Sequence, residues 1–265
     1  MNEKSYHLGA SASEQDRLHR QRVLYGDTQE IRFNPSDCVC EFGCGPLSNY
    51  WIAEMLSEGT FIGVDSSPLQ IEAASRRAKQ LGLPNVTLIA ADGRATGLPG
   101  ESVDASFARC VLIHLPEPKL LLKEMLRITR PNGRIILIEP HDPTYYVSPD
   151  KPNLLKCYRA RDYFAYFNCR GSPDVALNLY TFLSELGVRD IRIKPHIIFS
   201  TGAEPERCKL FLENWLGLIQ PVISSLINEG AVTESEWKAA QAEGESVSRE
   251  TFLYQSMWIA EARKC

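Results

Sequence analysis

Short apolar segments typical of β-strands alternate with helical segments between residues 36 and 140. The expected strands are DCVCEF at 37–42, FIGVD at 61–65, VTLIAAD at 86–92, VDASFAR at 103–109 and RIILIEP at 134–140. These runs lack clean alternation, which is typical of strands covered on both faces. We therefore expect an α/β fold built on a parallel sheet with right-handed crossovers. Further along, VRDIRIKPHIIFS alternates as a strand that is broken at Pro195.

The remaining segments are predicted to surround this core within one domain that spans residues 1–265. Residues 1–33 contain helical spacing and form an N-terminal helical arm. Residues 141–172 and 204–246 form helical insertions, expected on the substrate side of the core as a lid. The ligand-binding core itself is assigned to residues 36–140.

Composition excludes several classes of protein. The formal net charge of −4 gives no support for a nucleic-acid partner. The polar N-terminus lacks the pattern of a secretory signal, and no apolar run approaches the roughly 18 residues that span a bilayer. We therefore expect a cytoplasmic protein with no membrane span. The eight cysteines contain no C-x-x-C pair, so we expect reduced thiols and no metal site.

A glycine loop follows the first strand, where Gly43 and Gly45 allow a tight turn and close approach of a ligand. Asp65 ends the second strand twenty residues after Gly45, which suits a carboxylate that binds ribose hydroxyls. The Gly-x-Gly-x-x-Gly pattern of dinucleotide sites fails around Ser48, which disfavours NAD. Glu41 would oppose a pyrophosphate but could face an ammonium group, which favours an adenosine that carries an amino acid.

The segments CEFGCGP, GVDSSP, AADG, DASFARCVLIHL and MLRITRPNGRIILIEP occur in this order. Together they resemble the motifs of class I S-adenosylmethionine-dependent methyltransferases, in the small-molecule branch that includes ubiquinone-biosynthesis-type enzymes. The resemblance covers about residues 36–140 and implies a Rossmann-like, seven-stranded, mostly parallel sheet whose last strand is antiparallel. FLYQSMWIAEARK can supply that last strand. The family often has glycine where Leu47 stands, and Leu47 is interpreted as a tolerated substitution at a helix entry.

The resemblance also implies which residues hold S-adenosylmethionine. They are Glu41, Gly43 and Gly45 for the methionine moiety, Asp65 and Ser66 for the ribose, Asp92 and Gly93 for the adenine, and Arg109 and Cys110 through their backbone near the methionine end. Tyr6, His7 and Arg17 in the N-terminal arm resemble residues that close over the cofactor. A solvated helix with one buried tyrosine is the alternative for that arm.

The acceptor of the methyl group is expected beyond the fifth strand, beside Glu139, His141 and Asp142. His141 next to Asp142 offers a catalytic base whose pKa a carboxylate could raise, although a polar turn is the alternative interpretation. Aromatic residues at 158–167 could line an acceptor pocket or pack into the core. Trp215 and Trp237 suit either a lid or a plain helical hairpin.

The predicted function is S-adenosylmethionine-dependent methylation of a small organic acceptor. Such a transfer is an in-line displacement, in which the protein mainly aligns donor and acceptor and excludes water. The expected partner is therefore a small-molecule substrate, and the sequence is compatible with a homodimer. A non-catalytic protein that keeps the fold for binding is the second hypothesis, and an NAD-dependent oxidoreductase is the third.

Overall fold

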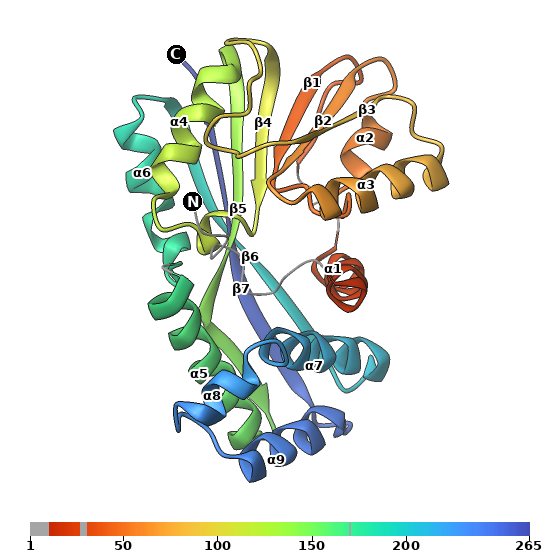
Figure 1. Cartoon of the computed structure of the whole chain (residues 1–265), viewed down its shortest axis with the longest axis vertical. Coiled ribbons are helices and arrows are strands. Elements are labelled where there is room, and N and C mark those ends of the chain that lie inside the picture. The colour runs from red at the N-terminus through yellow and green to blue at the C-terminus, as the bar shows by residue number, and fades with distance from the viewer. Residues whose placement is uncertain (1–10, 27–30, 170) are drawn as a thin grey trace.

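The computed structural model describes residues 11–26, 31–169 and 171–265. Its centre is a seven-stranded sheet (Figure 1). The strand order is β3 (Val86–Ala90), β2 (Thr60–Asp65), β1 (Cys38–Phe42), β4 (Val103–Arg109), β5 (Thr129–Ser148), β7 (Phe252–Arg263) and β6 (Arg189–Thr201). The β1–β2, β1–β4, β2–β3 and β4–β5 pairs are parallel, whereas β7 runs antiparallel to both of its neighbours. The predicted fold is therefore confirmed, including its antiparallel last strand.

Helices connect the strands, and several of them pack together at the lower end of the sheet. They are α1 (Ala12–Tyr25), α2 (Trp51–Met55), α3 (Pro68–Leu81), α4 (Pro118–Ile128), α5 (Pro152–Cys169), α6 (Leu179–Glu185), α7 (Pro205–Ile219), α8 (Ile223–Asn228) and α9 (Glu234–Glu245), with 3-10 turns at Leu112–His114 and Val175–Asn178. Among the described residues, none of these helices is long and apolar enough to cross a membrane.

Both faces of the upper sheet are covered, as the apolar strand sequences predict (Figure 1). Val39 of β1 packs into the cluster formed with α2 and α3, whereas the next residue, Cys40, packs into the cluster formed with α4 and α6. Successive residues of a strand point to opposite faces, so one short strand serves both clusters. Cys40 is fully buried and acts there as a small apolar side chain.

The lower half of the molecule differs from the prediction in two places. β5 does not end at Pro140 but continues to Ser148, after a register shift between His141 and Tyr146, because β7 provides a partner along its whole length. The segment 141–172 therefore begins as a strand rather than as a helical insertion. Pro195 does not break β6, since β6 lies at the edge of the sheet, where a proline costs no ladder bond on the open side.

Helices α5, α7, α8 and α9 pack against the extended lower ends of β5, β6 and β7 (Figure 1). Helices α7, α8 and α9 account for most of residues 204–246. A polar clamp joins two of these helices: Lys151 donates to the backbone oxygens of Glu243 and Ser246 at 2.5 and 2.6 Å. The Glu243 carboxylate in turn accepts backbone N–H groups of Asn153 and Leu154 at the start of α5. These hydrogen bonds give partners to backbone carbonyls at the C-terminal end of α9 and to backbone N–H groups at the N-terminal end of α5.

Candidate active site

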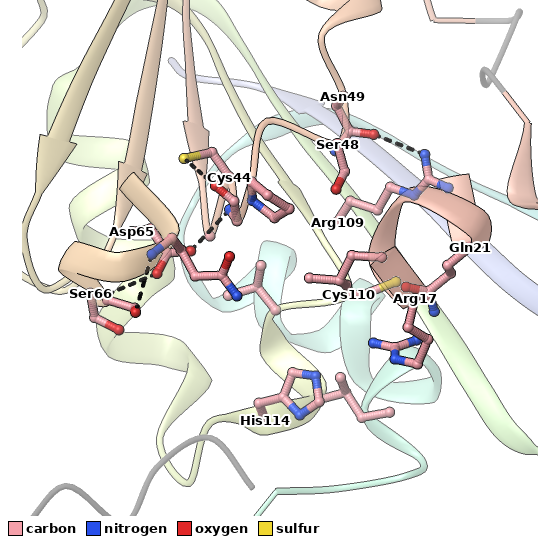
Figure 2. Close-up of a pocket in the computed structure, with 18 of the residues that line it drawn as sticks. Arg17, Gln21, Cys44, Ser48, Asn49, Asp65, Ser66, Arg109, Cys110 and His114 are labelled. Atoms are coloured by element: carbon pink, nitrogen blue, oxygen red, sulfur yellow. Dashed lines mark hydrogen bonds between the residues drawn. The ribbon is translucent and has the colours of Figure 1, made fainter. Parts of the chain in front are cut away.

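A cavity of about 950 Å³ opens at the carboxyl ends of β1, β2 and β4, the edge at which open α/β sheets bind their ligands (Figure 2). Helix α1 lies beside this edge, between the upper sheet and the lower helices (Figure 1). The loops after the three strands supply most of the polar wall, and α1 supplies another part of it. Pro140, Asp142, Arg161 and Leu218 contribute from the lower half. The volume lies within the range typical of small-molecule sites.

The glycine loop needs its glycines. Gly43 and Gly45 have φ angles of 66° and 53°, a region that L-residues with side chains seldom adopt. A Cβ on Gly43 would also lie 2.6 Å from Cγ2 of Val111. The N–H groups of Gly43 and Cys44 donate to the carbonyl of Val64 at 2.8 and 3.1 Å, which draws the loop against β2. The loop backbone therefore lies along the cavity wall.

Leu47 also has a left-handed backbone, with φ at 61°, and its side chain is fully buried. Because a leucine adopts this conformation only at an energetic cost, the position favours glycine. A glycine, which the resemblance led us to expect at this position, would adopt the same angle without that cost. The substitution is tolerated here because the leucine side chain packs in the same cluster as Trp51 and Ile52 of α2.

Asp65 is held at the end of β2 by two backbone hydrogen bonds. Its Oδ2 accepts the N–H of Gly45 at 3.0 Å, and its Oδ1 accepts the N–H of Ser67 at 2.9 Å. Burial raises the pKa of this carboxyl above its usual value. Each oxygen keeps a further lone pair, and both Asp65 and Ser66 line the cavity (Figure 2).

Glu41 lies behind the loop at the start of a buried polar chain. The amide nitrogen of Asn49 donates to Oε1 of Glu41, and Nη1 of Arg109 donates to the amide oxygen of Asn49 at 2.9 Å. Burial raises the pKa of Glu41 to about 8, while the Asn49 hydrogen bond and the Arg109 charge oppose the rise. Oε2 of Glu41 has no hydrogen-bond partner in the described part of the chain. Asn49 and Arg109 line the cavity, whereas Glu41 lies behind them.

Cys110 follows β4 with a left-handed φ of 55°, and its N–H donates to the carbonyl of Ile138 at 2.8 Å. Burial raises the pKa of its thiol to about 12, so the thiol stays protonated. Glu139 of β5 holds the turn that follows: its carboxylate accepts the N–H groups of Val111, Leu112 and Ile113 at 2.8 to 3.3 Å. Burial raises the pKa of Glu139 to about 7. Glu139 therefore supports the cavity wall and is not part of it.

Of the two residues expected at the adenine, one faces the cavity and the other faces the core. Asp92 lines the cavity and is half-exposed, and Arg94 pairs with it at 2.6 Å and lowers the pKa of its carboxyl. Gly93 turns toward the core, where an added Cβ would meet Leu121 at 3.0 Å and Phe42 at 3.3 Å. The glycine is thus required by packing, and only Asp92 faces the cavity.

His141 and Asp142 do not form the pair that the sequence suggested. Nε2 of His141 lies 3.1 Å from Oδ1 of Asp174, and His141 is not part of the cavity wall. Asp142 lines the cavity and accepts hydrogen bonds from Nη1 of Arg161 at 3.0 Å and from Gln255 at 2.9 Å. Because both residues lie in a strand rather than a turn, their side chains point in opposite directions.

Arg17 of α1 lines the cavity and is almost fully buried. It forms two hydrogen bonds to the Glu14 carboxylate at 2.7 and 2.8 Å and a third to Asn214 of α7 at 3.0 Å. The arm is therefore anchored, not solvated, at this position. Tyr6 and His7, also expected to close over the ligand, lie outside the described residues.

Several cavity residues were not identified from the sequence, and Arg161 is the clearest example. Its Nη1 binds both Asp142 and Asp162, the latter at 2.7 Å, and its side chain is 5% exposed. Burial raises the pKa of Asp162 despite this cation. The nearest sequence signal was the charged RARD segment inside an aromatic helix.

Four buried aromatic residues of the lower half pack together instead of lining the cavity. The ring centroids of Tyr145, Tyr158 and Trp215 lie 4.2 to 5.5 Å apart, and Phe211 adds an edge contact to Trp215 at 5.5 Å. Trp237 is buried in the same cluster. Core packing is therefore the correct interpretation for Tyr158, Trp215 and Trp237, whereas Tyr163 is 67% exposed and belongs to neither the core nor the cavity wall.

Within the described ranges, no group of three or more His, Cys, Asp or Glu side chains is arranged to hold a metal ion.

The family described as "Methyltransferase domain" matches residues 34–158. An uncharacterised methyltransferase of Mycobacteroides abscessus is 32% identical over 124 residues, which are 46% of this chain and 47% of that protein. A trans-aconitate 2-methyltransferase of Azoarcus sp. is 34% identical over 118 residues, 43% of this chain and 44% of that protein. The chain thus matches less than half the length of these curated relatives.

Among solved structures, the phosphoethanolamine N-methyltransferase 2 of Haemonchus contortus, in complex with phosphomonomethylethanolamine and S-adenosylhomocysteine, superimposes with a TM-score of 0.60. The two share 12% identity, and the match covers all of this chain and 60% of that protein. At this identity the likeness concerns the fold alone.

Proposed function

We propose that this chain, a class I methyltransferase by its fold and by the domain that residues 34–158 form, transfers a methyl group from S-adenosylmethionine to a small organic acceptor. The observation that carries the proposal is the set of groups around the 950 Å³ cavity. A left-handed glycine loop and a strand-end carboxylate line one end of it, and a buried acid with one unpartnered oxygen lies behind that wall.

The residues present fit that cofactor. Asp65 keeps lone pairs that can accept hydrogen bonds from both ribose hydroxyls, and Ser66 lies beside it. Asp92 is the carboxylate available to the adenine edge. Oε2 of Glu41 lacks a partner, and an ammonium group that reaches it directly or through water would satisfy it.

The backbone around Gly43 and Gly45, together with the turn at Arg109 and Cys110, would hold the methionine moiety of the cofactor. Arg109 is fixed by Asn49 and lies 5.5 Å from the ring centroid of Tyr25, so it joins the glycine loop to α1. Arg17, anchored to Glu14, closes the cavity from the same helix. Together these side chains would shield the reacting end of the cavity from water once the cofactor is bound.

When bound, S-adenosylmethionine supplies an activated methyl group on a sulfonium, whose sulfur leaves with the electron pair. The protein has to align an acceptor behind that methyl group. Asp142 is our candidate for this task, because it lies in the cavity wall and is held by Arg161 and Gln255. Its carboxylate can accept a hydrogen bond from an acceptor O–H or N–H. We assign His141 the role of positioning this strand through Asp174.

We propose a small metabolite or natural product as the acceptor, since cofactor and acceptor share one cavity of ordinary size. The acidic net charge of −4 argues against nucleic acid as the substrate. The trans-aconitate methyltransferase relative acts on a small acid, which supports the same class of acceptor. A cytoplasmic location and a homodimer complete the proposal.

The test is binding of S-adenosylhomocysteine to the full chain and to the Asp65→Ala variant by calorimetry. We expect saturable binding by the wild type and a loss of affinity of at least about 30-fold in the variant, because the ribose loses a charged acceptor. The Asp190→Ala variant removes an exposed carboxylate outside the cavity and is the matched control. Equal affinities of wild type and Asp65→Ala would refute the assignment of the ribose site.

Binding without methyl transfer would favour the second hypothesis, a protein that keeps the fold only to bind the cofactor. Mass spectrometry of reactions with small acids, phenols and amines separates the two, since a methylated product gains the mass of one CH₂ group.

A further inference from the structure

The lower ends of β5, β6 and β7 form a small antiparallel sheet with two different faces. Helices α5, α7, α8 and α9 cover one face, which carries Val147, Ile198 and Leu253, all nearly inaccessible to solvent. The side chains that alternate with these point the other way. On that opposite face they remain largely open to solvent.

The register places the exposed side chains in rows across the three strands. Tyr254 of β7 pairs with Tyr146 of β5 on one side and with Phe199 of β6 on the other. Phe252 occupies the next row of the same face, and Ile197 lies one row above Phe199. The ring centroids of Tyr146 and Phe252 lie 5.9 and 6.0 Å from that of Tyr254. We call these five residues the aromatic face.

The exposure of the aromatic face is unusual for a sheet that faces water. Tyr146, Ile197, Phe199 and Phe252 are 48%, 49%, 51% and 40% exposed. Solvated faces of antiparallel sheets normally alternate to polar residues, but none of the five side chains is charged. The two neighbours in the outer row, Ser148 and Thr201, are uncharged as well. The face therefore presents an uncharged surface that is mainly aromatic.

We propose that the aromatic face is the interface of a homodimer, in which two copies pack these sheets against each other about a two-fold axis. At about 200 Å² for a fully exposed aromatic side chain, the five residues present roughly 400 Å². A standard interface buries about 800 Å² on each partner, so the aromatic face supplies the apolar centre and the surrounding polar residues supply the rim.

A second copy fits this face better than other occupants. The face is a sheet surface rather than a groove, and the preferred partner of a sheet face is another sheet at about 10 Å. Because the face is uncharged, two copies of it can meet across a two-fold axis without charge repulsion, as an isologous contact requires. A lipid surface would call for lysine or arginine among the apolar side chains, and the aromatic face has neither. The proposal does not depend on the methyl-transfer activity.

The test is sedimentation velocity of the full chain over concentrations from about 1 to about 100 µM. We expect a species of twice the mass of one chain, and a dissociation constant raised by at least about 100-fold in Phe199→Lys and in Tyr146→Lys. Tyr180→Lys, at a 60% exposed tyrosine on α6 outside the face, is the matched control and should dimerise like the wild type. Circular dichroism must show that each variant remains folded.

Three outcomes would overturn the proposal. They are a wild type that stays monomeric throughout the range, a dimer that both aromatic-face variants leave intact, and a dimer that Tyr180→Lys disrupts equally. A monomeric wild type that cosediments with phosphatidylcholine vesicles would assign the face to a membrane surface instead. Loss of the dimer with retained binding of S-adenosylhomocysteine would support the interface independently of the proposed function.

Discussion

Replacing Glu41 by glutamine should change the pH dependence of folding stability. In the folded protein, burial raises the pKa of Glu41 from its ordinary 4.5 to about 8. As the pH rises above 4.5, the unfolded chain loses this proton while the folded protein keeps it. The folded state then binds more protons than the unfolded state, so the stability that Glu41 provides falls as the pH rises toward 8. Glutamine has no proton to lose.

The magnitude follows from the same linkage. At ~1.4 kcal/mol per pH unit, the wild type should lose about 4 kcal/mol relative to Glu41→Gln between about pH 5 and about pH 8. Urea unfolding at several pH values measures this difference. The buried Glu139, whose pKa is also raised, is present in both proteins, so its contribution cancels. Glu54→Gln, at an exposed glutamate of α2, should leave the wild-type profile unchanged.

The same substitution tests the role of Glu41 toward the cofactor. An ammonium group near Oε2 favours the ionised carboxylate, so the wild-type affinity for S-adenosylhomocysteine should rise as the pH approaches 8. Glu41→Gln should bind at least about tenfold more weakly at pH 8 and show a flatter profile. A stability difference that varies by less than about 1 kcal/mol across the range would refute the reasoning about burial.

Three further predictions concern stability and are measured by urea unfolding. Leu47→Gly should be more stable than Leu47→Ala by about 1 kcal/mol, because both variants lose the buried side chain but only glycine removes the cost of the left-handed backbone. The opposite order of stabilities would contradict this explanation. Glu139→Ala should lower the free energy of unfolding by about 3 kcal/mol or more, since three backbone N–H groups lose their acceptor. A loss below about 1 kcal/mol would show that water replaces the carboxylate. Lys151→Met should lower the free energy of unfolding by about 2 kcal/mol, because two carbonyls at the end of α9 lose their donor, whereas Lys238→Met at an exposed lysine should change it very little. Equal effects of the two substitutions would refute the role assigned to the Lys151 clamp.

The sheet was predictable because its signals are local. Each strand from β1 to the first half of β5 is a short apolar run bounded by turn residues, and the crossover rule then limits how such runs connect. The glycine loop and Asp65 were predictable for the same reason, since each has its own local signal: a glycine-rich turn directly after one strand, and an acid at the end of the next. The comparisons confirm the methyltransferase resemblance that rested on these motifs.

The lower half was less predictable because it depends on contacts between distant segments. β5 continues past Pro140 only because β7, more than a hundred residues later, pairs with it. Once this extension is known, the separation of His141 from Asp142 follows from strand alternation. The pairing of Arg161 with Asp142 joins a helix to that strand and has no local signal.

The buried chain from Glu41 through Asn49 to Arg109 shows the same limit within the core. Its ends lie 68 positions apart along the chain, as residue numbers 41 and 109 show, and meet only when β1 and β4 pair. Sequence motifs therefore indicated two members of the chain, but they did not indicate Asn49, which links them.

Isothermal titration of the full chain with S-adenosylhomocysteine tests the central claim most directly. The account predicts one site per chain with a dissociation constant below about 100 µM, which corresponds to a binding free energy of about −5.5 kcal/mol or better. It also predicts that this binding depends on Asp65. The absence of heat and of saturation at millimolar ligand, with a chain shown to be folded, would contradict the claim that this cavity is a methyl-donor site.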